Sequence, residues 1–258
     1  MVGSGESPTP SDHSDSSTTT EVPESPKTID LDDNKTRYKI IAEAINWDNL
    51  KKRGTKGEEL YYAPSDQNPY TGWAKTMHDN GQIWSLIQMK NGKLDGLGSS
   101  WHDNGQKEWE ATFKDGKESG PFTIWYENGN KSDEMHYSEG KQDGPYARWY
   151  MTGQMRFQGV YSKGLLITDA GWKPDGQRNK THVVDGTGMS FRYYENGQKQ
   201  EEVFFKDGKL LTYLVWKPNG EKCPFTDVVN GSGSLVYYNE DGTEKFRSTF
   251  KDGEIVED

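Results

Sequence analysis

From Tyr70 to the end of the chain, apolar and polar residues alternate in short runs that are separated by glycine-containing turns. Alternation with a period of two is typical of half-buried β-strands. Short turns such as Glu127-Asn128-Gly129 join consecutive runs, which indicates β-hairpins. The pattern therefore predicts an all-β chain made of successive hairpins.

The turns recur at a nearly constant interval. First-turn glycines are separated by 24, 24, 24, 23, 21, 23 and 22 residues, and a second turn glycine follows each by 11 residues, or by 10 in the fifth unit. Self-similarity of this kind identifies a repeat architecture. Eight units over residues 70–258 predict one elongated, twisted antiparallel sheet of tandem hairpins. The first-turn glycines are Gly81, Gly105, Gly129, Gly153, Gly176, Gly197, Gly220 and Gly242.

Two positions of the unit are apolar in all eight copies. One lies four residues before the first-turn glycine, and the other lies eight residues after it. Pro174 and Pro218, each two residues before a glycine, favour a three-residue turn with a glycine bulge. Such a loop would place both positions on one side of the sheet. The first position gives the expected aromatic spine of Trp101, Trp125, Trp149, Trp172, Tyr193, Trp216 and Tyr238, preceded by Met77. The second position holds Met89, Phe113, Tyr137, Tyr161, Val184, Phe205, Val228 and Phe250.

The chain before the array has a different composition. Residues 1–37 are rich in Ser, Thr, Pro and acidic residues, which predicts a disordered tail. The same composition is common in tethers that hold an exported domain off a membrane. The segment can therefore be interpreted either as such a tether or as a flexible cytosolic tail. Residues 38–69 are expected to cap the first sheet edge. They should contain a short helix or strand near Ile40 and a strand at Leu60-Tyr61-Tyr62.

The charge and composition narrow the choice of partner. The formal net charge of −10 argues against nucleic acid and against an anionic membrane surface, since both need a basic face, and it suits a basic protein. No apolar run is long enough for direct membrane insertion. Cys223 is the single cysteine, so no intrachain disulfide can form.

A further repeated position lies three residues before the first-turn glycine, and we expect this row of side chains on the sheet face opposite the aromatic spine. An exposed aromatic row is typical of a binding surface. The alternative is that repeat duplication copied surface residues that have no partner. The candidate protein-binding residues of this row are His78, His102, Tyr126, Tyr150 and Tyr194.

Catalytic and metal-binding patterns are weak in this sequence. His78 and His102 lie one repeat apart, hence about 10 Å by strand spacing, which is too far to share a zinc ion. The acids of the turns are ordinary turn residues. The sequence contains no Gly-x-Ser-x-Gly motif, and the Gly186-Thr187-Gly188 stretch opens a strand, not a phosphate-binding helix. We therefore expect no catalytic residues, no metal and no cofactor.

The units resemble MORN-type repeats, in particular the bacterial variant found in the YwqK-family antitoxins. The resemblance covers about residues 58–258 and is carried by Trp125-Tyr126-Glu127-Asn128-Gly129, Tyr193 to Lys199, Lys114 to Lys117 and Asp143-Gly144. Units five to eight depart from the pattern. The fifth is one residue short and sparsely apolar, and a kink is expected there.

The resemblance implies a non-enzymatic repeat protein that binds another protein along an extended sheet, as an antitoxin or immunity protein does. The alternative is a structural scaffold, tethered to a surface or envelope by residues 1–37, that self-associates through its sheet edge. The first interpretation implies a cytoplasmic protein and the second an extracytoplasmic one.

Overall fold

The computed structural model describes residues 29–256. They form one α-helix, α1 (Asn34–Glu43), one 3₁₀ helix, η1 (Trp47–Asn49), and twenty strands. No helix in this range is long and apolar enough to cross a bilayer. The strands are β1 (Ile45–Asn46), β2 (Lys51–Arg53), β3 (Leu60–Tyr62), β4 (Gly72–Met77), β5 (Ile83–Lys90), β6 (Lys93–Trp101), β7 (Lys107–Lys114), β8 (Lys117–Trp125), β9 (Lys131–Ser138), β10 (Lys141–Gln142), β11 (Gly144–Trp149), β12 (Met155–Ser162), β13 (Leu165–Gly171), β14 (His182–Val184), β15 (Thr187–Tyr193), β16 (Lys199–Lys206), β17 (Lys209–Val215), β18 (Gly233–Tyr238), β19 (Glu244–Lys251) and β20 (Glu254–Val256).

The strands follow one another in sequence order. Fifteen of them form one large sheet, ordered β1-β4-β5-β6-β7-β8-β9-β11-β12-β13-β14-β15-β16-β17, with β10 paired to β9. β18, β19 and β20 form a separate three-stranded sheet, and β2 pairs with β3. All hairpin pairs are antiparallel, and β1 joins β4 in parallel. The predicted all-β array of tandem hairpins is confirmed.

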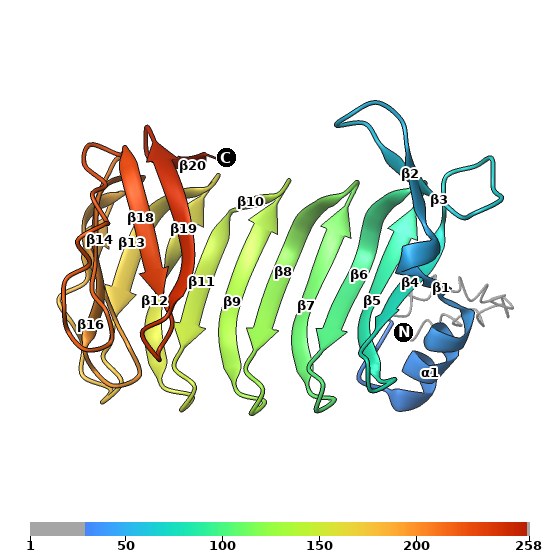
Figure 1. Cartoon of the computed structure of the whole chain (residues 1–258), viewed down its shortest axis with the longest axis horizontal. Helices are drawn as coiled ribbons and strands as arrows, with labels where there is room; N and C mark the ends of the chain where they lie inside the picture. Colours follow the sequence, from blue (N-terminus) through green and yellow to red (C-terminus); the bar gives the residue numbers. More distant parts are fainter. Residues whose placement is uncertain (1–28, 257–258) are drawn as a thin grey trace, which may run out of the picture.

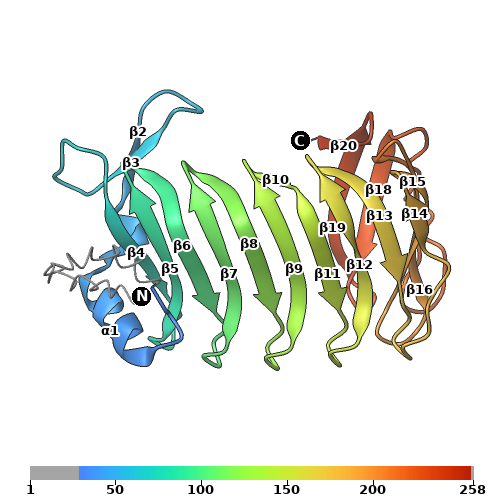
Figure 2. The same ribbon diagram turned by 180° about the vertical axis from the view of Figure 1, so that it is seen from behind.

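The sheet curls at its C-terminal end, where β18 and β19 lie over one face of β11 and β12 (Figures 1 and 2). The turns of distant units meet as a result: the Met151 amide donates to Glu195 at 2.7 Å, and the Glu195 amide donates to Glu240 at 3.2 Å. We call the face inside this curl the inner face and the other one the outer face.

Each hairpin turns through three residues. In the third unit the Tyr126 amide donates to the Asn130 carbonyl at 2.9 Å, and the Gly129 amide donates to the Tyr126 carbonyl at 2.9 Å. Glu127, Asn128 and Gly129 are the loop, as predicted. All eight first-turn glycines have a positive φ, between 81° and 87°. A residue with a side chain is strained at such a positive φ, which explains why glycine occupies this position.

The asparagine before the glycine links one turn to the next. The Asn104 Oδ1 accepts from the Gln106 amide at 2.9 Å, and its Nδ2 donates to the Glu127 carbonyl of the following turn at 2.8 Å. Asn128 repeats both contacts with Asn130 and Met151. The turn residue therefore fixes its own loop and the spacing of neighbouring hairpins.

The expectation that the two apolar positions share one side of the sheet is wrong. Ile124 pairs with Asp133 but Trp125 pairs with Lys131, so Ser132 is an extra residue beyond the turn bulge. This second bulge shifts the alternation of the following strand by one residue. Tyr137 consequently lies on the inner face, with its ring centroid 5.9 Å from that of Phe122. Trp125 projects from the outer face.

Residues 29–69 cover the first edge and both adjoining faces, with Leu50 packed on Ala74 and Met89 of the inner face. Asp33 caps α1 by accepting from the Thr36 amide at 2.8 Å, and β1 pairs with β4 at the sheet edge. Leu31 is buried against Trp101. The strand expected at Leu60–Tyr62 is confirmed. α1 begins at Asn34, inside the segment predicted as a tail, while residues 1–28 of that segment lie outside the described range. The division into tail, cap and array stays a prediction.

Unit five has a second strand of only three residues, β14, and in unit seven isolated bridges take the place of the second strand. The kink expected at the fifth unit stays a prediction. In both units, a buried threonine replaces part of the ladder. The Thr181 hydroxyl accepts from the Phe191 amide at 2.8 Å and donates to the Phe191 carbonyl at 3.1 Å. The Thr226 hydroxyl makes the same two contacts with Val236, at 3.1 and 3.4 Å. One side chain thus satisfies two backbone groups.

Replacing this hydroxyl should destabilise the fold. Thr181→Val keeps the shape of the side chain but leaves the Phe191 amide without this acceptor, while the Phe191 carbonyl keeps the Asn179 Nδ2 at 3.1 Å. We expect the free energy of unfolding to fall by about 2 kcal/mol or more. Thr123→Val, on the outer face of the regular strand β8, is the control and should change it by less than about 0.5 kcal/mol. Urea unfolding measures both, and equal effects would contradict the role given to Thr181.

Candidate functional site

Four aromatic side chains line the inner face of β7, β8 and β9. The Trp109 ring lies 6.4 Å from that of Phe113 and 6.0 Å from that of Phe122, both edge to face. Phe122 lies 5.9 Å from Tyr137. All four are only partly buried. We call these residues the aromatic strip.

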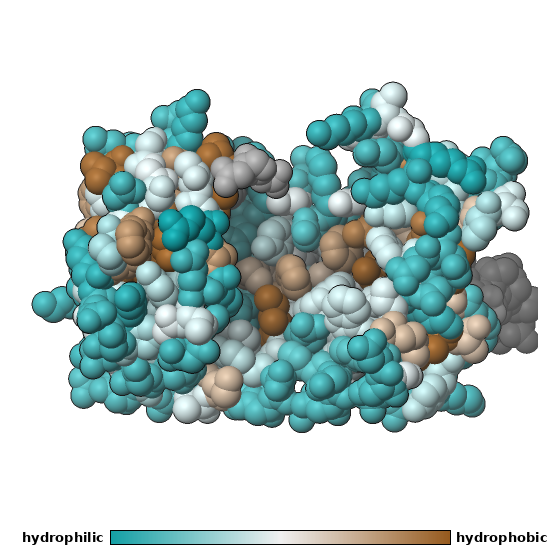
Figure 3. Space-filling view, viewed as in Figure 1, coloured by the Kyte–Doolittle hydropathy of each residue, from teal (hydrophilic) through white to brown (hydrophobic). Residues whose placement is uncertain are grey.

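A glycine on the neighbouring strand β6 makes room for the strip. A Cβ atom on Gly98 would lie 2.9 Å from the Phe113 ring and 3.2 Å from the Trp109 ring. The two rings therefore pack directly on the backbone of β6, and Gly98 has a negative or extended φ that any residue could adopt. Its role is space, not turn geometry. Strands β7, β8 and β9 lie between the C-terminal strands and the N-terminal cap (Figure 1), and apolar surface is visible in the hollow there (Figure 3).

A groove of about 640 Å³ lies beneath the C-terminal strands. Tyr146 lines it, with its ring 5.4 Å from Phe157 and 5.0 Å from Tyr161. Arg148 and Arg192 approach the Phe157 ring at 5.2 and 3.6 Å. The Arg148 side chain is 41% exposed and forms an ion pair with Asp133. The groove thus ends in an accessible guanidinium group.

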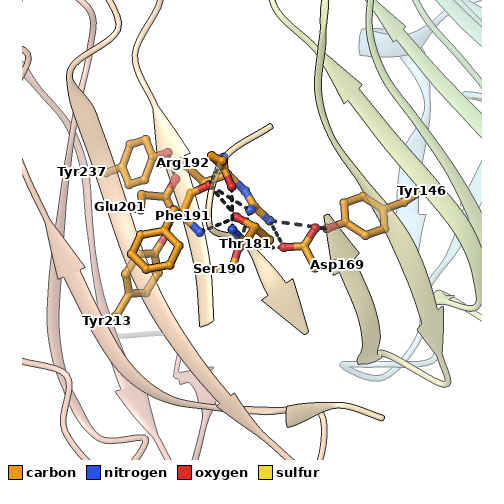
Figure 4. A network of polar contacts seen from close by, with 10 residues as sticks. Tyr146, Asp169, Thr181, Ser190, Phe191, Arg192, Glu201, Tyr213 and Tyr237 are labelled. Atoms are coloured by element: carbon orange, nitrogen blue, oxygen red, sulfur yellow. Dashed lines mark hydrogen bonds and ion pairs between the residues drawn. The ribbon is translucent and has the colours of Figure 1, made fainter. Parts of the chain in front are cut away.

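A buried ion pair lies deeper in the groove (Figure 4). The Arg192 Nη2 lies 2.6 Å from the Asp169 Oδ2, and the two side chains are 11% and 0% exposed. The Tyr146 hydroxyl and the Ser190 hydroxyl also donate to the Asp169 carboxylate, each at 2.7 Å. Burial raises the pKa of Tyr146 above its ordinary value. Three hydrogen-bond donors offset the free-energy cost of removing the Asp169 carboxylate from water.

A second buried carboxylate ties the C-terminal sheet to the array. Glu201 of β16 accepts hydrogen bonds from the hydroxyls of Tyr213 on β17 and Tyr237 on β18. Burial, reinforced by the charge of Glu201, raises the pKa of both tyrosines well above the ordinary value near 10. The hydrogen bonds of Glu201 join strands β16, β17 and β18 and so hold the C-terminal sheet against the array. We call Glu201, Tyr213 and Tyr237 the clamp.

The row proposed as an exposed binding surface has a structural contact in common. The ring nitrogen of His102 lies 3.0 Å from the Trp125 carbonyl, and the Tyr126 hydroxyl donates to the Trp149 carbonyl at 2.8 Å. His78, Tyr150 and Tyr194 make the equivalent contacts with the carbonyls of Trp101, Trp172 and Trp216. The expected exposure is wrong at Tyr150 and Tyr194, which are fully buried. A binding role for the row stays a prediction.

The aromatic spine lies on the outer face, and basic side chains cover its rings. Lys107 lies 5.5 Å from the Trp125 centroid, Lys131 5.8 Å from Trp149 and Lys199 3.7 Å from Trp216. Trp101 is 2% exposed because α1 and Leu31 cover it. The members that follow along the array, Trp125 and Trp149, are only half-buried.

Sequence reasoning identified Phe113 and Tyr137 as a repeated apolar position but missed Trp109, Phe122 and the buried charges. The sequence feature that could have revealed the buried charges is the pair of residues three and four positions after the first-turn glycine. Because of the second bulge, both side chains of this pair point to the inner face. Ser132-Asp133 and Gln200-Glu201 are such pairs, and all four are buried. Among residues 29–256 no group of three His, Cys, Asp or Glu residues is arranged to hold a metal ion.

The clamp predicts sensitivity to alkali. Below pH 10 the tyrosines are neutral in both states and the contribution of Tyr213 and Tyr237 is complete. Above pH 10 the unfolded chain loses these protons while the folded chain keeps them, so stability falls as pH rises. Each retained proton contributes a slope of about 1.4 kcal/mol per pH unit. Urea unfolding from pH 9 to 11.5 should show a smaller slope for Tyr237→Phe than for the wild-type chain.

The control for this measurement is Tyr38→Phe, at a ring that is 68% exposed. It should leave the slope unchanged. Tyr237→Phe also removes a hydrogen bond, which lowers the free energy of unfolding at every pH. The test therefore compares how steeply the free energy of unfolding changes with pH, not its absolute value. An unchanged slope in Tyr237→Phe would contradict the buried hydroxyl contact.

Comparison with known protein families gives a match to one part of the array. The model of the MORN repeat variant matches residues 187–207, which span β15, its turn and β16 in the sixth unit. No curated protein matches the chain. The match covers one unit, and the structure repeats the same hairpin along the array. Together they support a MORN-type repeat protein with a binding or scaffold role.

Proposed function

We propose that this chain is a non-enzymatic binding protein of the antitoxin or immunity type, which holds a segment of a protein partner against its inner face. The observation that carries the proposal is the aromatic strip of Trp109, Phe113, Phe122 and Tyr137, whose rings are packed together yet only partly covered. Aromatic clusters of this kind supply most of the binding energy in protein interfaces.

The site has the parts that an interface needs. The strip gives a fixed apolar centre, because the strands and Gly98 hold its rings in place. The groove beside it supplies hydrogen-bonding groups, and Arg148 gives a charge for orientation. Interfaces commonly combine an apolar centre with a polar rim. The rigid sheet lowers the conformational cost of binding.

The charge of the chain favours a basic partner. The net charge of −10 raises the association rate of a positively charged protein and disfavours acidic competitors. Toxin neutralisation is one use of such a surface, and the resemblance to the YwqK-family antitoxins favours it.

Two neighbouring substitutions on β8 test the inner face. Phe122 lies in the strip, and Thr123 points to the outer face one residue later. The chain would be co-expressed with the protein encoded beside its own gene, and growth would be measured. We expect wild-type chain and Thr123→Asp to restore growth, and Phe122→Asp to lose at least ten-fold in protection because it places a charge against the partner's apolar surface.

Thermal unfolding checks that the Phe122→Asp variant is folded, and Tyr137→Ala, a milder change in the same strip, is its second test. Full protection by both strip variants would exclude the inner face. Absence of protection by the wild-type chain would refute the antitoxin function.

A further inference from the structure

The first units of the array show how the outer face is bound by another segment. Leu31 is 1% exposed and lies in one apolar cluster with Trp101, which is itself 2% exposed. The Asp32 carboxylate lies 2.7 Å from the Lys107 Nζ. The guanidinium of Arg37 lies 5.3 Å from the centre of the Trp101 ring. An aliphatic side chain followed directly by a carboxylate thus seats on a tryptophan and a lysine of the array.

The repeat provides the same two groups again, 24 residues on. Lys131 occupies the position of Lys107 and lies over Trp149 as Lys107 lies over Trp125. Each lysine pairs with the acid three residues later at 2.8 Å. Lys107 has Asp32 as an additional partner and its side chain is 14% exposed, whereas that of Lys131 is 45% exposed. Among residues 29–256, the difference between the two positions is the bound acidic segment.

A hollow adjoins this second position. It has a volume of about 750 Å³, and Pro145, Ala147, Trp149, Val160 and Val184 contribute to its lining. Val160 and Val184, which both line it, are 41% and 47% exposed, which is unusual for side chains of this type in a recess. Arg178, His136, His182 and Glu134 also line the hollow. The hollow therefore combines apolar side chains with ionisable ones.

We propose that the outer face around Trp125, Lys131 and Trp149 binds a short acidic–aliphatic segment of a partner protein. Its carboxylate pairs with Lys131 as Asp32 does with Lys107, and its aliphatic side chain enters the hollow beside Trp149, the ring over which Lys131 lies. Lys131 and Arg178 supply positive charge beside the acid Glu134, which suits a carboxylate. This site is separate from the inner face and does not depend on the function proposed for it.

The test uses the full chain and a peptide that carries the sequence Ile-Asp-Leu-Asp-Asp of residues 29–33. Binding would be followed by the indole N–H signals of the tryptophans in an NMR titration. We expect the Trp125 and Trp149 signals to shift, and the affinity to fall at least ten-fold in Lys131→Glu and in Val184→Asp. A peptide with asparagine in place of each aspartate should also bind at least ten-fold more weakly.

Two matched controls locate the effect. Lys117→Glu changes an exposed lysine at the start of β8, and Phe122→Asp changes the inner face of that strand; both should bind the peptide as the wild-type chain does. Equal binding by Lys131→Glu, equal binding of the asparagine peptide, or loss of binding in Phe122→Asp would overturn the proposal.

A second copy of the chain is the competing occupant, since its own Ile29–Asp33 segment has the required sequence. Sedimentation of the wild-type chain across concentration decides this point. A monomer is expected. A dimer that the peptide dissociates would assign the surface to self-association and overturn the proposal of a partner segment.

Discussion

The second bulge of each hairpin determines which face every side chain of the array takes. An extra residue directly after the turn, Ser132 in the third unit, reverses the alternation of the strand that follows. Without it, Trp125 and Tyr137 would point to one side and the sheet would have one apolar and one polar face. With it, both faces carry an aromatic row: Trp125 and Trp149 outside, Phe113 and Tyr137 inside. Such a sheet has two surfaces able to bind, and each must be covered or kept open separately.

Contacts between successive units follow from the same geometry. Residues adjacent in sequence, such as Trp125 and Tyr126, project from opposite faces, so the tyrosine can reach the Trp149 carbonyl of the next unit. Asn128 makes a second link, from turn to turn. Each hairpin is therefore fixed to its neighbour at the turn and within the strand, which is how a thin sheet with few aliphatic residues stays ordered. At the C-terminal end the buried carboxylate of Asp169 adds contacts between neighbouring units, and that of Glu201 links unit six to unit eight.

The sequence predicted what depends on local geometry. Glycine with a positive φ, the three-residue loop and the strand at Leu60–Tyr62 follow from turn chemistry and alternation. The face of Tyr137 did not, because a bulge formed by an ordinary residue such as Ser132 leaves no composition signal. The buried pair of Arg192 and Asp169 was equally hidden, since its members lie 23 residues apart and meet across the three-residue strand β14. In the sequence, Thr181 cannot be distinguished from any other polar residue of a strand, so its two hydrogen bonds to the Phe191 backbone could not be predicted.

The two ends of the array cover its faces to different extents. At the N-terminal end, Leu31 covers the outer face at Trp101 and Leu50 covers the inner face at Ala74 and Met89. The inner strip that includes Trp109 and Phe122 stays open. At the C-terminal end, the curl covers the inner face through Glu201 and Tyr237 and leaves the outer hollow beside Trp149 open. A repeat array whose units were all equivalent would offer one continuous surface. Here the closing segments make the units unequal, so the open inner and outer surfaces are confined to the middle of the chain, where backbone pairing is most regular and the supporting strands are most rigid.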